Sequence, residues 1–346
     1  MADMADRRRV GILGSGGWAG CYAAALAESS TCKLVAVAGG SHAAEFAAKH
    51  GLRVESSAEA LANADDVEAV VVATPHGAHA DGALPALKAG KPVLVEKPMA
   101  TSLADCDRMM AAAARSGATL RVGHSRRLFP LVKQAREVLA SGRLGPIVMM
   151  RQTFSHNARN FGSKPGHWMS DPQASMGFFI GYGCHQLDMM IHLVGSPVVE
   201  VAGSFGNYWA DTPVENCGAM FLRFANGVYT TLWEVCSMPA ELKTWPPFPG
   251  LCERSEIVCR NGLMVLDPYA RLAVRWADEW ETLRELPWKD ADPVTQFLAE
   301  EVACLFRAAG GEDAFPLATA EEGRHVVAVC LAGLESSRTG RAVRIE

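Results

Sequence analysis

RVGILGSGGWA, residues 9–19, is the stretch of sequence that decides the fold of the first part of the chain. Its apolar start is followed by Gly14, Gly16 and Ala19 in the spacing G-x-G-x-x-G/A. This pattern predicts a strand, a tight turn and a helix whose first backbone N–H groups face an anion. Gly14 would form the turn, Gly16 would let a pyrophosphate approach the backbone, and Ala19 would let the helix pack on the strand. The predicted dinucleotide-binding residues here are Gly14, Gly16, Gly17, Trp18 and Ala19.

The residues that follow alternate between short apolar runs and helical patterns. Strands are expected near residues 33–38, 68–73, 92–95 and 119–122, and helices near 43–50, 78–88 and 102–115. Continuous apolar strands separated by helices predict a parallel sheet that is covered on both faces.

The pattern changes after about residue 125. Longer strands of alternating polar and apolar residues follow, and Asn226-Gly227 and Asn261-Gly262 predict hairpins between them. The predicted fold class is therefore α/β, with a nucleotide-binding domain over residues 1–125 and an α+β domain over residues 126–346. The second domain should hold a large, mostly antiparallel open sheet. Whether the C-terminal helices pack back on the first domain is left open.

The composition of the chain is that of a globular protein. Its 346 residues, 49% apolar and 21% charged, are enough for two domains with separate cores. A formal net charge of -5 without a long basic tract argues against a nucleic-acid or anionic-membrane partner. The apolar runs are strand-sized and the ten cysteines form no CxxC pair. We therefore expect a cytoplasmic protein with reduced thiols, no membrane span and no metal centre.

The end of the second expected strand bears on the choice of cofactor. An NAD-binding protein usually has an acidic residue there for the ribose hydroxyls. This chain has Gly39-Gly40-Ser41-His42 instead, with no acid. Ser41 could donate a hydrogen bond to a 2′-phosphate and His42 could pair or stack, which favours NADP over NAD. Because no arginine secures the phosphate, NAD stays open as the alternative.

Two further strand ends carry candidate residues, Thr74 to His79 and Glu96-Lys97-Pro98. In a parallel sheet these carboxyl ends face the ligand crevice. A lysine at this edge would lie beside a nicotinamide ring, where its cation could hold a substrate hydroxyl and favour the alkoxide. The residues predicted to contact the cofactor from these two segments are Thr74, Pro75, His76, His79, Glu96 and Lys97.

Taken together, these motifs resemble those of the Gfo/Idh/MocA oxidoreductases, which include glucose–fructose oxidoreductase and inositol dehydrogenase. The resemblance continues through residues 168–172, 183–188 and 335–341. It implies a Rossmann NAD(P)-binding domain, then an α/β domain whose sheet forms the interface of a homodimer or homotetramer. It also implies that Lys97 is the central catalytic residue and that His185 is the general acid/base.

One position departs from the family pattern. Many members carry an aspartate four residues before the histidine, and this chain has Gly181 there. Either Lys97 and His185 suffice, or the substrate lacks the hydroxyl that the aspartate would bind. Asp188, three residues after His185, would lie one helical turn away as an orienting partner or a packing residue.

The substrate side of the sequence is basic and aromatic. Arginines suit the recognition of carboxylates, so an anionic substrate is favoured, with ordinary solvated or interface arginines as the alternative. The predicted substrate-binding residues are His124, Arg126, Arg127, His156, Trp168 and Asp188.

Three interpretations of the function stay open at this point. The first is a dehydrogenase of a sugar or cyclitol, and the second is a dehydrogenase of a carboxylated aromatic cis-dihydrodiol. The third is a dinucleotide-binding sensor or regulatory protein without catalysis, which Gly181 keeps open and which Lys97 and His185 argue against.

Overall fold

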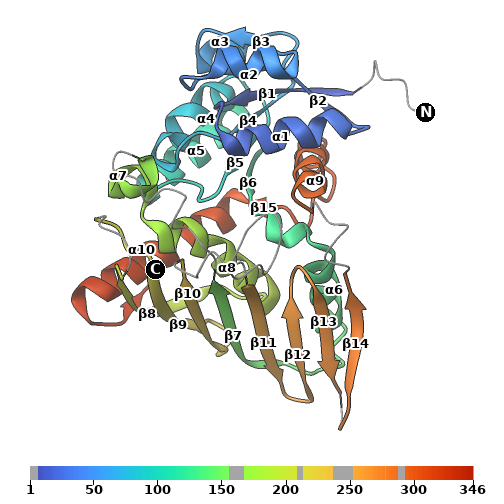
Figure 1. Cartoon of the computed structure of the whole chain (residues 1–346), viewed down its shortest axis with the longest axis vertical. Helices are drawn as coiled ribbons and strands as arrows, with labels where there is room; N and C mark the ends of the chain where they lie inside the picture. The colour runs from blue at the N-terminus through green and yellow to red at the C-terminus, as the bar shows by residue number, and fades with distance from the viewer. Residues whose placement is uncertain are drawn as a thin grey trace. The chain divides into compact units, whose positions relative to one another are not determined.

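The computed structural model describes residues 7–155, 167–208, 213–236, 252–276, 278–286 and 293–345 (Figure 1). Backbone contacts divide the chain into two compact units. Unit 1 comprises Met1–Leu128 and Asp292–Arg324, and unit 2 comprises Phe129–Ala291 and His325–Glu346. The domain bounds expected from the sequence, residues 1–125 and 126–346, stay a prediction.

Unit 1 is built on a seven-stranded sheet with the order β15-β6-β5-β4-β1-β2-β3. Strands β1 to β6 are parallel, and β15 pairs with β6 in the antiparallel sense. This order confirms the predicted Rossmann arrangement, because it brings the carboxyl ends of the parallel strands to one edge. The strands are β1 (Arg8–Leu13), β2 (Cys32–Ala38), β3 (Arg53–Glu55), β4 (Ala69–Val72), β5 (Val93–Glu96), β6 (Leu120–Gly123) and β15 (Ala318–Thr319).

Helices cover both faces of this sheet (Figure 1). Helix α1 packs against α9, and α4 packs against α3 and α5. The α5 helix shows how sequence sets an end: Ser102 Oγ accepts a hydrogen bond from the Asp105 N–H at 3.1 Å, and Gly117 ends the helix with φ 76°. The helices are α1 (Gly17–Glu28), α2 (Ala43–His50), α3 (Ala58–Asn63), α4 (His79–Lys88), α5 (Leu103–Ser116), α9 (Pro293–Ala309), and the 3₁₀ turns η2 (His76–Ala78) and η3 (Ser125–Leu128).

Unit 2 is built on a nine-stranded sheet with the order β14-β13-β12-β11-β7-β10-β9-β8-β16. β7 and β10 are parallel, and the other neighbours are antiparallel, which confirms the predicted sheet type. The strands are β7 (Ile147–Ser155), β8 (Val198–Gly206), β9 (Cys217–Phe224), β10 (Tyr229–Val235), β11 (Cys252–Cys259), β12 (Gly262–Asp267), β13 (Arg271–Arg275), β14 (Trp280–Glu285) and β16 (Val343–Arg344).

Two hairpins in this sheet were expected from Asn-Gly pairs. Asn226-Gly227 lies between β9 and β10, and Asn261-Gly262 lies at the β11–β12 turn, so both predictions are confirmed. The remaining elements are α6 (Pro130–Ala140), η4 (Trp168–Ser170), α7 (Pro172–Ser175), α8 (Phe178–Val194) and α10 (Ala320–Thr339), the last divided between the two units.

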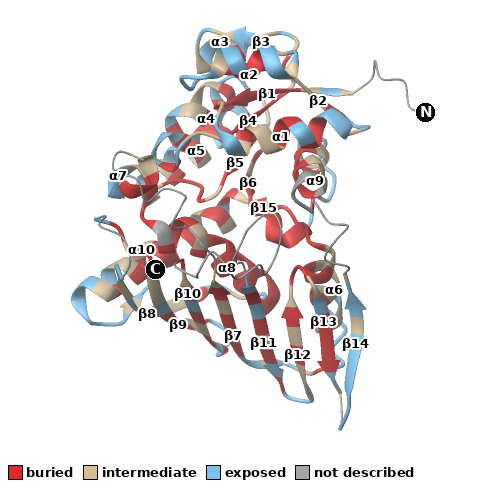
Figure 2. Cartoon of the chain, viewed as in Figure 1, coloured by how far each residue is buried: buried red, intermediate tan, exposed pale blue. Residues whose placement is uncertain are grey.

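The two faces of the nine-stranded sheet differ in exposure. Along β7 the side chains of Met150, Gln152 and Phe154 are buried, while Met149 and Arg151 are exposed (Figure 2). The buried face is covered by helices, since α8 contacts β7, β9 and β10, and α6 contacts β12 and β13. This alternation is the period of two that the sequence shows.

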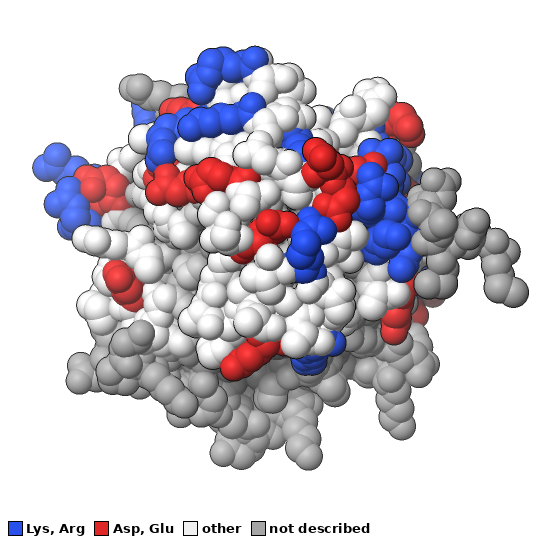
Figure 3. Space-filling view, turned by 90° about the horizontal axis from the view of Figure 1, so that it is seen from above, with Lys and Arg blue, Asp and Glu red and all other residues white. Residues whose placement is uncertain are grey.

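Charged side chains of both signs lie interspersed on the face shown in Figure 3. The ion pairs within unit 1 include Arg53 with Asp66 at 2.7 Å and Arg108 with Asp105 at 2.6 Å. Within the described ranges, every helix is too short or too polar to cross a lipid bilayer.

Candidate active site

The glycine-rich turn after β1 begins at Gly14, where the backbone conformation suits only glycine. Gly14 has φ 112°, and a Cβ there would lie 2.5 Å from the Ala73 carbonyl oxygen. Gly16 and Gly17 are different, because a Cβ on either would meet no atom within 4 Å. Packing within the protein therefore does not require glycine at the α1 N-terminus. A phosphate approaching the backbone would require it, so the turn fits a dinucleotide.

The loop after β2 lies against this turn. A Cβ on Gly40 would be 2.2 Å from Ser15 Oγ, so the two turns are in direct contact. Ser41 and His42 follow on the surface, and His42 Nδ1 lies 3.3 Å from Glu45 Oε2. Glu45 is an acidic residue that sequence reasoning missed, because it lies in the first turn of α2 rather than at the strand end.

His79 joins the segment after β4 to the segment after β5. Its ring is fully buried, with Nδ1 2.9 Å from the Pro98 carbonyl oxygen and Nε2 2.9 Å from the Thr74 carbonyl oxygen. Burial is the main cause that lowers the pKa of His79 to about 4, so the ring is neutral at physiological pH. A neutral ring has one N–H and donates it to one of these two carbonyl oxygens. The close contacts with both indicate that His79 positions the Thr74 and Lys97 segments. A direct cofactor contact by His79 stays a prediction.

The four segments that follow β1, β2, β4 and β5 thus meet at one edge of the parallel sheet. Beside Thr74, the Pro75 side chain is exposed, whereas His76 is buried, with its ring 5.7 Å from that of His79. Lys97 is half-buried directly after β5, and its N–H donates to Glu96 Oε2 at 3.2 Å. The structure brings together the residues that the spacing of the motifs predicted for unit 1, around the turn of α1.

The basic residues after β6 are buried. His124, Arg126 and Arg127 have exposed fractions of 1%, 9% and 1%. Arg127 Nη1 lies 2.8 Å from Glu322 Oε2 and so fastens η3 to the start of α10. This guanidinium is committed to an intramolecular ion pair, and a substrate contact by Arg127 stays a prediction.

The predicted residues of unit 2 lie on α8 and η4. His185 and Asp188 are buried, with exposed fractions of 7% and 0%, one helical turn apart. Trp168 packs against a small apolar cluster that contains Met169, Val214 and Cys236. His156 lies outside the described residues.

A carboxyl group that sequence reasoning missed lies at the N-terminus of α8. Glu215 Oε1 accepts a hydrogen bond from the Ile180 N–H at 3.4 Å. Gly177, the residue before the helix, has φ 94° and leaves room for this carboxyl, since a Cβ there would lie 2.1 Å from it. Burial raises the pKa of Glu215 to about 7. No motif marks this residue in the sequence, because the contact depends on the fold of β9 and α8.

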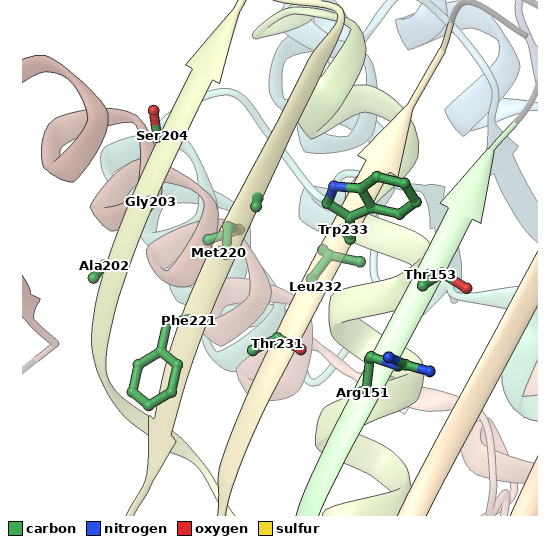
Figure 4. Close-up of a pocket in the computed structure, with 11 residues that line it drawn as sticks. Arg151, Thr153, Ala202, Gly203, Ser204, Met220, Phe221, Thr231, Leu232 and Trp233 are labelled. Carbon is green, nitrogen blue, oxygen red and sulfur yellow. The ribbon is translucent and has the colours of Figure 1, made fainter.

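A hollow lies on the exposed face of the nine-stranded sheet (Figure 4). It is lined by residues of β7, β8, β9 and β10, among them Arg151, Phe221 and Trp233. Its lining contains none of the predicted catalytic or cofactor residues. Among the described residues, no group of three or more His, Cys, Asp or Glu side chains could hold a metal ion.

Family models match both parts of the chain. Residues 8–124 match the oxidoreductase family with an NAD-binding Rossmann fold, and residues 132–264 match the GFO/IDH/MocA C-terminal domain. A relative from Saccharopolyspora erythraea, inositol 2-dehydrogenase 2, is 30% identical over 89% of this chain and 85% of its own length. The chain belongs to the GFO/IDH/MocA family.

Two further similarities extend the comparison. The 1-carboxy-3-chloro-3,4-dihydroxycyclohexa-1,5-diene dehydrogenase of Comamonas testosteroni is 38% identical over 51% of this chain. The match spans 44% of that relative, so the chain aligns with less than half of its length. A solved levoglucosan dehydrogenase, in complex with NADH and levoglucosan, has a TM-score of 0.84 and 20% identity over 98% of this chain and 99% of its own, which shows a shared fold.

Proposed function

We propose that this GFO/IDH/MocA protein is an NAD(P)-dependent dehydrogenase that moves a hydride between a cyclic secondary alcohol and nicotinamide. The observation that carries the proposal is the meeting of four segments at one sheet edge, with an open glycine turn and Lys97 after β5. That edge is where α/β sheets bind dinucleotides.

The chain would supply three functions in the reaction. The first N–H groups of α1 would hold the pyrophosphate, and the Lys97 ammonium would bind the substrate oxygen and stabilise negative charge on it. His185 would accept the hydroxyl proton, a role that the family resemblance supports. The bound nicotinamide would supply the hydride acceptor.

For the substrate we propose a carboxylated cyclic diol. Two observations support this class: the name of the Comamonas testosteroni relative, and Arg126 after β6, at the ligand edge of the sheet. Gly181 fits a substrate without the hydroxyl that an aspartate would bind. A cyclitol or sugar is the second candidate, which the longer match to the inositol dehydrogenase supports.

For the cofactor we propose a preference for NADP over NAD. The loop Gly39 to His42 carries no acid that would repel a 2′-phosphate. Two observations argue for NAD instead. The levoglucosan dehydrogenase with a similar fold is in complex with NADH, and the exposed carboxylate of Glu45 beside His42 would repel a 2′-phosphate. The ratio of kcat/KM for NADP to that for NAD tests it, and a ratio below one would refute it.

We further propose that the chain forms a homodimer or homotetramer through the exposed face of its nine-stranded sheet. Five apolar side chains on this face are 42% to 56% exposed, an unusual cluster for a surface in water. They are Met149, Phe221, Tyr229, Trp233 and Val258. A Trp233→Glu variant should shift the mass in light scattering toward the monomer, and an unchanged mass would exclude this face. We also propose a reducing, cytoplasmic location, since each of the ten cysteines, all within the described residues, is outside any disulfide.

The test of the activity is a turnover assay by nicotinamide absorbance with carboxylated dihydrodiols, cyclitols, sugars and sugar acids. We expect turnover of at least one class, and Lys97→Ala should lower kcat/KM by about 10²- to 10⁴-fold. Lys88→Ala, at the end of α4, is the control and should leave kcat/KM unchanged. Tight dinucleotide binding without any turnover would favour the sensor instead.

A further inference from the structure

Three buried oxygen-bearing side chains meet beside Lys97. They are Tyr22 of α1, Glu96 of β5 and Glu301 of α9, with exposed fractions of 0%, 5% and 0%. The Tyr22 hydroxyl oxygen is 2.7 Å from Glu96 Oε1 and 3.0 Å from Glu301 Oε2. Helix α9 contacts both α1 and β5, so packing within unit 1 holds the three side chains together.

The number of hydrogens in this cluster limits its charge. A tyrosine hydroxyl has one hydrogen, and a carboxylate has none. Two short oxygen–oxygen contacts to the same hydroxyl therefore need a second hydrogen, which one of the carboxyl groups must carry. Burial and the two carboxyl groups raise the pKa of Tyr22 well above 10, so the phenol keeps its own proton. Two ionised carboxylates in this dry site would also repel each other.

The surrounding groups indicate which carboxyl group carries the proton. Burial raises the pKa of Glu96, and the positive charge and backbone N–H of neighbouring Lys97 act in the opposite direction and favour its ionised form. Tyr22 adds a hydrogen bond at the shorter of its two distances. The other charged residues on elements that contact α9 include Arg126 and Arg127 of η3, and Arg127 is paired with Glu322.

We propose that Glu301 keeps a proton at neutral pH and donates it to the Tyr22 oxygen, while Tyr22 donates to ionised Glu96. Tyr22 and Glu301 are then positioning residues that hold one negative charge beside Lys97. Their effect on catalysis rests on the proposed role of Lys97. The protonation of Glu301 does not, because it follows from the distances and the neighbouring charges within unit 1.

The first test measures the proton directly, without substrate. Buried Glu215, with a pKa of about 7, would contribute a band of its own, so the test uses proteins that all carry Glu215→Gln. The infrared spectrum of this parent protein in neutral D₂O should show the carbonyl stretch of a buried protonated carboxyl group, and Glu301→Gln should remove that band. The amide is the size of the protonated acid and can donate to Tyr22, so the variant should keep its fold. Glu300→Gln, on the same helix, is the matched control and should keep the band. A parent spectrum without the band, or a spectrum that Glu301→Gln leaves unchanged, would overturn the proposal.

The second test measures the effect on the reaction. Tyr22→Phe removes the hydroxyl that stabilises ionised Glu96, so the pKa of Glu96 should rise further. The acidic limb of the kcat–pH profile should then move to higher pH, with little change in KM, while Glu301→Gln should keep a profile close to that of the wild type. If Tyr22→Phe left the profile in place, the positioning role would be wrong. If no substrate were turned over, the proposed function would fail while the infrared result still stood.

Discussion

The glycine turn after β1 in unit 1 and the N-terminus of α8 in unit 2 are both helix starts, yet they are built differently. At α1 the residue before the helix is Gly16, no side chain caps it, and the space around its Cα is open. At α8 the residue before the helix is Gly177, and the carboxyl of Glu215 fills the space beside it. The first helix start can receive an anion from outside, whereas a carboxyl group of the protein already occupies the second.

The difference shows that a glycine before a helix has two distinct uses. Gly16 leaves room for a ligand, and Gly177 leaves room for a buried side chain. The G-x-G-x-x-A spacing marks the first use, because a ligand must contact consecutive backbone positions. The second use leaves no local pattern, since Glu215 and Gly177 are 38 positions apart in the numbering of the chain.

The largest effect is expected where a glycine lies against the backbone. Gly14→Ala would place a Cβ 2.5 Å from the Ala73 carbonyl oxygen at φ 112°. We expect a loss of about 3 kcal/mol or more in the free energy of unfolding. Urea unfolding followed by circular dichroism measures it, with Gly20→Ala as the control, because a Cβ there meets no atom within 4 Å. A Gly14→Ala protein as stable as the wild type would mean that the turn adopts a different backbone conformation.

The carboxyl at the start of α8 should make the stability depend on pH. The pKa of Glu215 is raised to about 7 in the folded protein, so its contribution is present below the unfolded pKa and is lost as pH rises through 7. This loss amounts to about 3 kcal/mol between pH 4 and pH 8. Glu215→Gln should remove that part of the pH dependence in urea titrations. The same slope in the variant as in the wild type would show that another group is responsible.

Substitutions of the two adjacent arginines of η3 should affect different properties. For Arg127 the property is the stability of the fold, and for Arg126 it is the binding of substrate. Arg127→Ala breaks the buried pair with Glu322 and should cost about 2 kcal/mol, less than a fully buried pair because Glu322 is 42% exposed. Arg126→Ala should instead raise KM for a carboxylated substrate without a change in KM for an uncharged one. Melting temperatures and steady-state kinetics of both variants check this. Equal effects of the two substitutions on KM would contradict the assignment of substrate binding to Arg126 and of a structural role to Arg127.

The sequence predicts those parts of the molecule that depend on short-range backbone geometry. The existence of strands β1, β2, β4, β5 and β6, the glycine turn and the two Asn-Gly hairpins all follow from local patterns. The short edge strand β3 and helix α3 were missed, because the three residues of β3 are largely exposed and carry no apolar run.

Side-chain networks were beyond sequence reasoning for a different physical reason. The hydroxyl of Tyr22 meets Glu301 across 279 positions, and Arg127 meets Glu322 across 195. Such contacts depend on how the helices pack on the sheet, and the spacing of residues in a sequence motif does not predict that packing. Arg127 shows the consequence, since its place after β6 suggested substrate binding and the structure gives it an ion pair.

The most direct test of a dinucleotide site at the start of α1 compares cofactor binding by the wild type with that by Gly16→Val. Calorimetric titration with NADPH and with NADH should show binding to the wild type and an affinity at least about tenfold weaker in the variant, about 1.4 kcal/mol. The melting temperature without cofactor should change little, because a Cβ at Gly16 meets no protein atom within 4 Å. Equal affinities in the two proteins, or no binding of either dinucleotide to the wild type, would contradict a dinucleotide site at the start of α1.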